Sequence, residues 1–212
     1  MSITITQEGS TMMKLFITIL LMCVLTIPSF ADYTYVITDG MDFGGRNLGS
    51  GQSLLMTGGG GHTLDLGYDS FAIIQGTAPY NQDVYPSGGI ERISVAGYAH
   101  LDFLGGEVYE IGVGSYGTAT LSGGAIQRLR TTQVVVYGQI EPYVTLYHKG
   151  YEHDELTNML IGFWADGSPF AIQLVDVPNY TPTIDNINFV YIPEPATLLL
   201  LGLGGLLIRR KK

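Results

Sequence analysis

The chain has 212 residues, of which 46% are hydrophobic and 14% charged, and its formal net charge is −9. This hydrophobic content excludes an intrinsically disordered chain, because disorder requires low hydrophobicity, and the single cysteine excludes an intrachain disulfide. Between residues 32 and 192 the net charge is −12, which excludes a nucleic-acid-binding domain because phosphates would be repelled.

The first predicted element is a secretory signal peptide over residues 1–31. From Met13 the sequence "MKLFITILLMCVLTIPSFAD" places one cation, Lys14, before an apolar run and a small-residue cleavage site. Signal peptidase is expected to cut between Ala31 and Asp32. The residues before Met13 lack the positive charge that opens a signal peptide, so Met13 is an alternative start. The competing interpretation is a buried core strand or helix.

A glycine-rich β-repeat region is predicted over residues 32–140. Copies of 18 residues begin at Ser87, Gly105 and Gly123. Residues 18 apart form three matching columns: Gly88, Gly106 and Gly124; Ile90, Val108 and Ile126; and Ile93, Ile111 and Leu129. A weaker copy begins at Gly60, and an insertion over residues 75–86 separates it from the others.

This period predicts a mostly β chain folded as a short parallel β-solenoid, or β-helix-like repeat. Each coil would form one turn, with equivalent residues about 4.8 Å apart along the stack. The apolar columns would become interior ladders, because a single coil buries no face alone. The alternative is an antiparallel sandwich whose hairpins recur. Strands are predicted at residues 34–38, 71–75, 92–97, 132–138, 143–148, 170–177 and 187–192.

Residues 141–191 break the period and predict a β-hairpin-rich cap over the open end of the solenoid, whose unpaired edge would otherwise recruit other chains. The turn residues Asp166-Gly167 separate Trp164 from Phe170, which indicates a hairpin. The stretch "HDELTNMLIGF" over residues 153–163 indicates either a helix or a loop leading into a strand.

The chain closes with "IPEPATLLLLGLGGLLIRRKK" over residues 192–212. The apolar run at 196–208 is shorter than the ~20 residues that a membrane-spanning helix needs. Four cations follow it and would hold the end on the cytoplasmic side, as the positive-inside rule requires: Arg209, Arg210, Lys211 and Lys212. We therefore expect a short transmembrane helix that stops export transiently, rather than a permanent anchor.

The two ends together resemble the PEP-CTERM class of exported bacterial proteins. The resemblance implies that Pro193, Glu194 and Pro195 form the sorting motif, with Arg209 and Arg210 as its basic end. It further implies signal peptidase and the membrane protease exosortase as partners, in Gram-negative bacteria that make extracellular polysaccharide. The prolines keep the motif extended, as a protease needs. The resemblance covers only this tail and leaves the role of the preceding domain open.

The sequence predicts no catalytic residue. "GVGSYG" around Ser115 has the spacing of a solenoid corner rather than of a nucleophile elbow. For polysaccharide cleavage, two carboxylates must face one groove, and Asp102 with Glu107 or Glu110 are the candidates on adjacent coils. A lyase would add a basic residue, for which the candidates are Arg92, Arg128 and Arg130. Arg92, Glu110 and Arg128 share one column, however, and a surface charge ladder is the simpler interpretation.

No metal or cofactor is predicted. "GGGGHTLDL" from Gly58 lacks the aspartate of a calcium-binding nonapeptide, because Thr63 stands in its place. Two clusters were candidates: a zinc set of His148, Glu152, His153, Asp154 and Glu155, and calcium oxygens from Asp185, Asn186 and Asn188. The spacing of the histidines suits one helix face poorly, and a solvated acidic loop is the simpler interpretation.

The functional hypothesis is a non-enzymatic structural or adhesive protein, exported to the cell surface or extracellular matrix after transient anchoring in the inner membrane. The alternative is a polysaccharide-binding or polysaccharide-cleaving solenoid at the same place. Outward tyrosines would suit stacking on sugars and favour binding over cleavage: Tyr98, Tyr109, Tyr116 and Tyr137. A second alternative is a membrane protein that retains its tail.

Overall fold

The structure is a computed structural model that describes residues 33–81, 88–132 and 143–193. These residues belong to one compact unit and form fourteen strands and one short 3-10 helix. The fold is therefore mostly β, as predicted. The predicted signal peptide, with its cleavage site at Ala31 and Asp32, lies outside the described residues.

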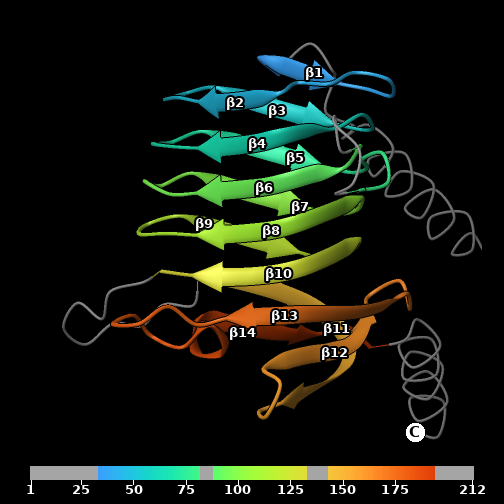
Figure 1. The fold of residues 1–212 in the computed structure, drawn as a ribbon, viewed down its shortest axis with the longest axis vertical. Helices are drawn as coiled ribbons and strands as arrows, with labels where there is room; N and C mark the ends of the chain where they lie inside the picture. Colours follow the sequence, from blue (N-terminus) through green and yellow to red (C-terminus); the bar gives the residue numbers. More distant parts are fainter. Residues whose placement is uncertain (1–32, 82–87, 133–142, 194–212) are drawn as a thin grey trace, which may run out of the picture. The chain divides into compact units, whose positions relative to one another are not determined.

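The strands form two columns of parallel strands, and up to β11 the chain alternates between them (Figure 1). The first column contains β1 (Tyr35–Ile37), β3 (Ser53–Met56), β5 (Phe71–Ile74), β7 (His100–Phe103), β9 (Thr118–Leu121) and β11 (Val144–Asp154). The second contains β2 (Gly45–Leu48), β4 (Gly61–Leu66), β6 (Ile90–Val95), β8 (Glu107–Val113), β10 (Ala125–Thr131) and β13 (Pro169–Val175).

The register within each column follows the 18-residue period of the sequence. The predicted apolar columns are confirmed, because Ile90 pairs with Val108 and Val108 with Ile126. The weaker copy also lies in register, since Leu64 of β4 pairs with Ile93 of β6 across 29 residues. The extra length is the predicted insertion, which the stack accommodates between β5 and β6.

The corners that lead into β6, β8 and β10 need glycine. Gly88, Gly106 and Gly124 have φ values of 80°, 96° and 83°, a region that side chains rarely adopt. A Cβ on Gly106 would also lie only 2.6 Å from the backbone nitrogen of Thr77. The predicted glycine column therefore marks close backbone contacts between neighbouring coils.

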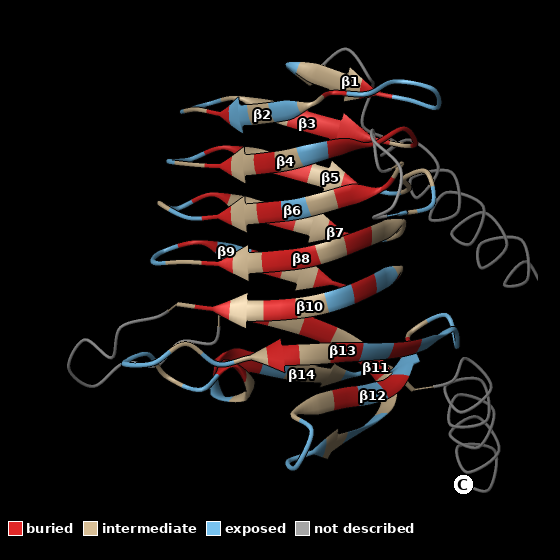
Figure 2. Cartoon of the chain, viewed as in Figure 1, coloured by how far each residue is buried: buried red, intermediate tan, exposed pale blue. Residues whose placement is uncertain are grey.

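The core lies between the two columns, and side chains alternate between the core and the solvent (Figure 2). One inward column is fully buried: Leu64, Ile93, Ile111 and Leu129. The same column begins with Arg46, which pairs with Leu64 one coil further along. The sequence prediction missed this first coil, because a charged residue breaks the apolar pattern there.

The C-terminal segment pairs with the last coil through both columns. β11 pairs with β9, and β13 pairs with β10. Between them, β12 (Met159–Trp164) is antiparallel to both and joins the two columns into one sheet. The short helix η2 (Thr183–Asn186) then leads to β14 (Ile187–Tyr191), which lies parallel to β11.

Two predictions for this segment have different outcomes. The hairpin at Asp166-Gly167 is confirmed, and the Trp164 ring is fully buried with its Nε1 donating to the Gly124 carbonyl over 2.8 Å. The helix considered for residues 153–163 is wrong, because β11 continues to Asp154 and β12 starts at Met159. Among the described residues, no helix has the length and apolar character to cross a membrane.

Candidate functional site

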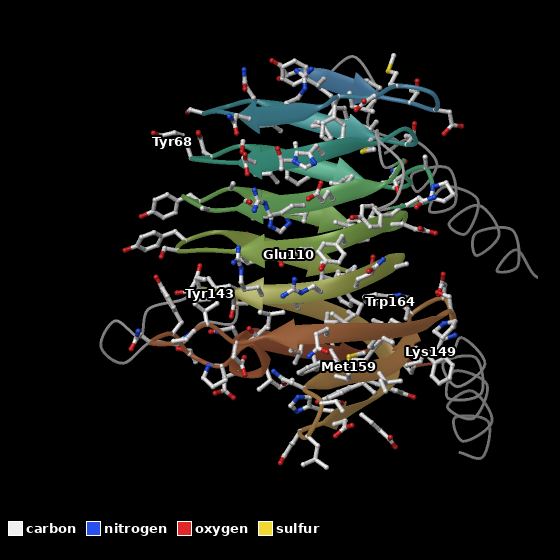
Figure 3. The ribbon with its side chains drawn as sticks, in the orientation of Figure 1. Tyr68, Glu110, Tyr143, Lys149, Met159 and Trp164 are labelled. Atoms are coloured by element: carbon white, nitrogen blue, oxygen red, sulfur yellow. The ribbon has the colours of Figure 1, made fainter. Side chains whose placement is uncertain are left out.

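Three tyrosines, here called the corner tyrosines, project from successive turns between the columns. Tyr68 lies between β4 and β5, Tyr98 between β6 and β7, and Tyr116 between β8 and β9. Their side chains are 72%, 72% and 57% exposed. Figure 3 shows Tyr68 at the loop edge of the stack. The Tyr98 and Tyr116 rings stack with centroids 5.0 Å apart.

The backbone of each corner tyrosine is left-handed. The φ values are 58° for Tyr68, 68° for Tyr98 and 62° for Tyr116. For a bulky residue this conformation is uncommon and costs on the order of 1 kcal/mol. Three exposed aromatic side chains thus occupy turns in which glycine or asparagine would be less strained, and backbone strain of this kind is concentrated at functional sites.

The sequence prediction found Tyr98 and Tyr116 but missed Tyr68. The insertion before β6 shifts Tyr68 out of the 18-residue period, and Tyr68 occupies the turn position that Gly97 takes in the next coil. The signal available in the sequence was a tyrosine after glycine or serine at the end of each strand, in "LGYD", "AGYA" and "GSYG".

The other two tyrosines proposed for sugar stacking differ from the corner tyrosines. Tyr109 points from β8 into a half-buried contact, where its ring stacks on Tyr80 at 5.8 Å and its hydroxyl accepts a hydrogen bond from Arg128 at 3.2 Å. Tyr137 lies outside the described residues. The structure therefore supports the sugar-stacking geometry at the corners and not at Tyr109.

The predicted charge column forms on the outer face of β6, β8 and β10. Arg92, Glu110 and Arg128 pair in register. Glu110 is only 9% exposed, and its carboxylate lies 3.5 Å from the Arg128 guanidinium and 3.4 Å from that of Arg130. Two arginines thus neutralise one buried carboxylate, which is an arrangement that stabilises the sheet face.

The three carboxylates considered for polysaccharide cleavage do not converge. Asp102 lies on β7 in one column, whereas Glu107 and Glu110 lie on β8 in the other. The Glu107 carboxylate accepts a hydrogen bond from the backbone N–H of Tyr80 at 2.8 Å. The prediction that these groups could share a groove is wrong, because a strand and its successor occupy opposite faces of the stack.

A hydroxyl–imidazole–carboxylate row that the sequence prediction missed lies on β7 and β9. Thr118 Oγ1 lies 2.7 Å from His100 Nδ1, and His100 Nε2 lies 3.0 Å from Asp102 Oδ1. The Phe71 ring stacks on the imidazole at 5.7 Å. The backbone N–H groups of Thr118 and His100 donate to the carbonyls of Ala99 and Ser70, so neither is free to stabilise an oxyanion.

The candidate metal ligands are used within the fold. In the zinc set, Asp154 accepts hydrogen bonds from Leu156 and Thr157, and His153 contacts Asn158 at 2.9 Å. In the calcium set, Asn186 is buried and donates to Thr131 at 2.8 Å. Across the described ranges, no three His, Cys, Asp or Glu side chains are grouped to hold a metal ion.

His148 instead occupies an aromatic cluster where the C-terminal tail leaves the domain. Its side chain is 6% exposed and lies edge-on to the rings of Tyr151, Phe189 and Tyr191, at centroid distances of 4.8, 6.1 and 6.0 Å. Burial lowers the pKa of His148 below its usual 6.5. Its backbone carbonyl accepts a hydrogen bond from Ile192 at 2.8 Å.

The sorting residues follow this hydrogen bond directly. Pro193 is the last described residue, and the remaining predicted residues of the tail lie outside the described ranges: Glu194, Pro195, Arg209, Arg210, Lys211 and Lys212. No spacer separates β14 from the predicted motif, because β14 ends at Tyr191.

Comparison with known families identifies the tail. Residues 192–212 match the PEP-CTERM protein-sorting motif, so the resemblance noted in the sequence is confirmed. No curated protein and no solved structure matches the chain. The motif marks an exported protein that is sorted through exosortase.

Proposed function

We propose that the chain is a non-enzymatic structural or adhesive protein of the bacterial cell surface or extracellular matrix. The observation that carries this proposal is the sorting motif at residues 192–212, attached without a spacer to a mostly β domain. The parallel strands in an 18-residue register further suit a β-solenoid, an architecture that offers long repetitive surfaces.

The proposed route uses both ends of the chain. Signal peptidase removes residues 1–31, and the apolar run at 196–208 enters the inner membrane with the four cations on the cytoplasmic side. Exosortase then cuts at the Pro193–Pro195 motif and releases the domain. Neither step needs a metal or cofactor in this chain.

A specific observation favours polysaccharide as the adhesive partner. The corner tyrosines present three exposed rings in a row, and the flat apolar faces of sugar rings stack on such surfaces. The same row argues for binding rather than cleavage, because the nearest acidic groups belong to other faces of the stack. Asp102, for example, is engaged by His100.

Mass spectrometry of the protein from its native host tests the sorting route. We expect the mature chain in the medium or matrix to begin near Asp32 and to lack everything after about Ile192. A strain without exosortase should accumulate the chain with its tail in the membrane fraction. An intact Lys212 in the membranes of the unmodified strain would instead support the retained membrane protein.

Co-sedimentation with the host's purified extracellular polysaccharide tests the adhesive partner. The double variant Tyr98→Asn, Tyr116→Asn should lose binding. Tyr180→Asn is the matched control, because Tyr180 is 40% exposed but lies outside the corners. Equal binding by all three proteins would leave the structural role and remove polysaccharide as the ligand of the corner tyrosines.

A further inference from the structure

We propose that the outer face of β12 and β13 rests on the lipid surface of the membrane while the sorting tail is inserted. This cap face consists of the outward side chains of these strands, namely Met159, Ile161, Phe163, Pro169 and Ala171. The inference rests on the proposed insertion of the tail, and it adds a second membrane contact that is made by the folded domain itself.

The alternation along β12 creates the cap face. Leu160 and Trp164 point inward and are fully buried, whereas Ile161 and Phe163 point outward and are 52% and 53% exposed. The facing strand β13 continues the apolar surface, because Ala171 pairs with Ile161 and Pro169 with Phe163. Both of these β13 residues are exposed. An exposed strand face with apolar residues in this arrangement marks an interaction surface.

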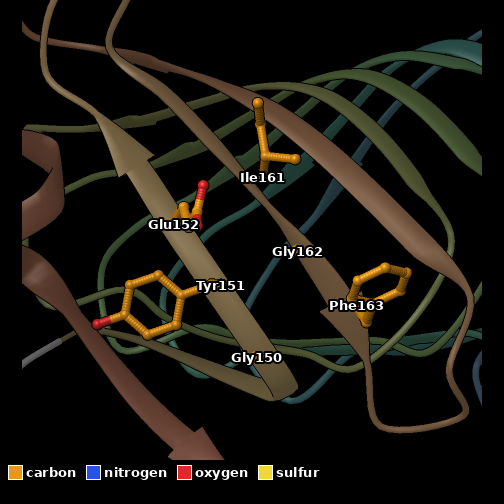
Figure 4. A pocket seen from close by; sticks show the side chains of 6 residues that line it. All are labelled: Gly150, Tyr151, Glu152, Ile161, Gly162 and Phe163. Carbon is orange, nitrogen blue, oxygen red and sulfur yellow. The ribbon is translucent and has the colours of Figure 1, made fainter.

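A shallow hollow deepens the cap face beside Phe163. It has a volume of about 470 Å³ and is lined by Gly150, Tyr151, Glu152, Ile161, Gly162 and Phe163 (Figure 4). A Cβ on Gly150 would meet nothing within 4 Å, so the missing side chain leaves space next to the Phe163 ring. Figure 4 shows the Ile161 and Phe163 side chains along one strand of this hollow.

The tail leaves the domain close to this face. The Ile192 N–H bonds to the His148 carbonyl, and on the other edge of β11 His148 pairs with Trp164 and Gly150 with Phe163. The exit point is therefore next to the Phe163 end of the cap face. An apolar segment that enters the bilayer only a few residues after Ile192 would bring this end of the domain to the lipid surface.

The residues around the exit suit the membrane interface. Tyr151 and Tyr191 are 40% and 59% exposed, and tyrosines with one apolar and one polar end concentrate at the level of the headgroups. The exposed acids Glu152, Asp154 and Glu155 lie on the same hairpin. Because anionic headgroups would repel these carboxylates, the matching surface is a zwitterionic one.

Quenching by brominated lipid tests the proposal on the full chain. The protein is produced in a host without exosortase, so that it keeps its tail, and is reconstituted into vesicles of brominated phosphatidylcholine. Phe163→Trp places a reporter on the cap face, and Tyr68→Trp places a matched reporter at a distant, exposed corner. Each signal is compared with that of the unmodified chain, since Trp164 is present in all three.

We expect co-flotation of all three proteins with the vesicles, and a clear loss of the added fluorescence for Phe163→Trp but not for Tyr68→Trp. Co-flotation without quenching at position 163 would overturn the cap-face contact and leave the inserted tail intact. Failure to float would overturn the tail insertion, and with it the inference. Disulfide-linked dimers of Phe163→Cys on the vesicles would assign the face to a second copy and would also overturn it.

Discussion

The guanidinium carbon of Arg46 lies 4.3 Å from the centroid of the Tyr35 ring, over the end of the inward column that continues with Leu64. β1 and β2 are the two end strands of the sheet within the described ranges. An inward-pointing charge is one of the means by which proteins protect open sheet edges from pairing with other chains. The Arg46–Tyr35 pair thus closes the core with a cation where the next coil would need an aliphatic side chain.

Arg46→Leu should therefore promote association through the β1–β2 end. Leucine would complete the apolar column and leave an edge that accepts another stack. Sedimentation velocity over a concentration series measures the effect, and the variant should form larger species at concentrations at which the unmodified protein does not. Arg46→Lys keeps the charge and should resemble the unmodified protein; equal behaviour of all three would contradict the proposed protection.

Gly106→Ala should destabilise the domain. The backbone at this residue has a φ of 96°, and the added Cβ would meet the Thr77 nitrogen at 2.6 Å, so we expect a loss of about 1–3 kcal/mol in the free energy of unfolding. Urea denaturation measures it. Gly150→Ala is the matched control, since its Cβ enters open space, and it should unfold at the same urea concentration as the unmodified protein. A neutral Gly106→Ala would contradict the close packing of the corners.

Substitution of Tyr98 should separate backbone strain from the stacking of the ring. Tyr98→Asn relieves a left-handed conformation that asparagine tolerates, but it loses the ring contact with Tyr116, which is worth about 0.5–1.5 kcal/mol. The two effects should nearly cancel. Tyr98→Val keeps the strain and adds a branched Cβ, so it should lower the free energy of unfolding by about 1–2 kcal/mol. If both variants are equally stable in urea, the turn does not hold the backbone in this conformation.

His148 should make the domain less stable in mild acid. Its pKa is lowered by burial in the folded state, so the unfolded chain takes up the proton first as the pH falls. The contribution of neutral His148 to stability is complete above about pH 6.5 and is lost as the pH falls from there toward the lower pKa of the folded protein. Thermal unfolding at intervals between pH 7.5 and 5 measures this loss.

His148→Phe should remove that dependence, because phenylalanine fills the aromatic cluster and does not titrate. The carboxylates cannot produce the same effect in this range. Hydrogen bonds from Thr157 and Ser168 hold the pKa values of Asp154 and Asp166 below their usual 3.8, so their contribution is lost only below about pH 4. An equal loss of stability in the His148→Phe variant above pH 5 would rule out His148 as its source.

Much of the register was predictable from the sequence, because a parallel stack places residues one coil apart in direct contact. The columns through Ile90 and Ile93 report that contact. The first coil was not predictable in this way, since Arg46 and Tyr35 form an end and an end has no apolar partner to match. The pairing of β14 with β11 was likewise hidden, because nothing in a local pattern tells a strand which distant edge it will join.

The candidate site was predictable only in part. Tyr98 and Tyr116 follow the period, whereas the insertion displaces Tyr68. The row of Thr118, His100 and Asp102 arises from contacts between coils that single-strand patterns do not report. Conversely, the predicted meeting of Asp102 and Glu110 failed because the sequence distance between them says nothing about which of the two columns each strand joins.

The constant offset between coils has a consequence for how such a chain changes in evolution. Duplicating any stretch of 18 residues within the repeats adds one strand to each column and leaves the Arg46 end and the C-terminal end unaltered. Each duplication would lengthen the domain by about 4.8 Å, the spacing between neighbouring strands, and would add one more turn for an aromatic ring. Length, and with it the reach of the rings from the anchoring end, can thus vary by whole increments while both termini keep their chemistry.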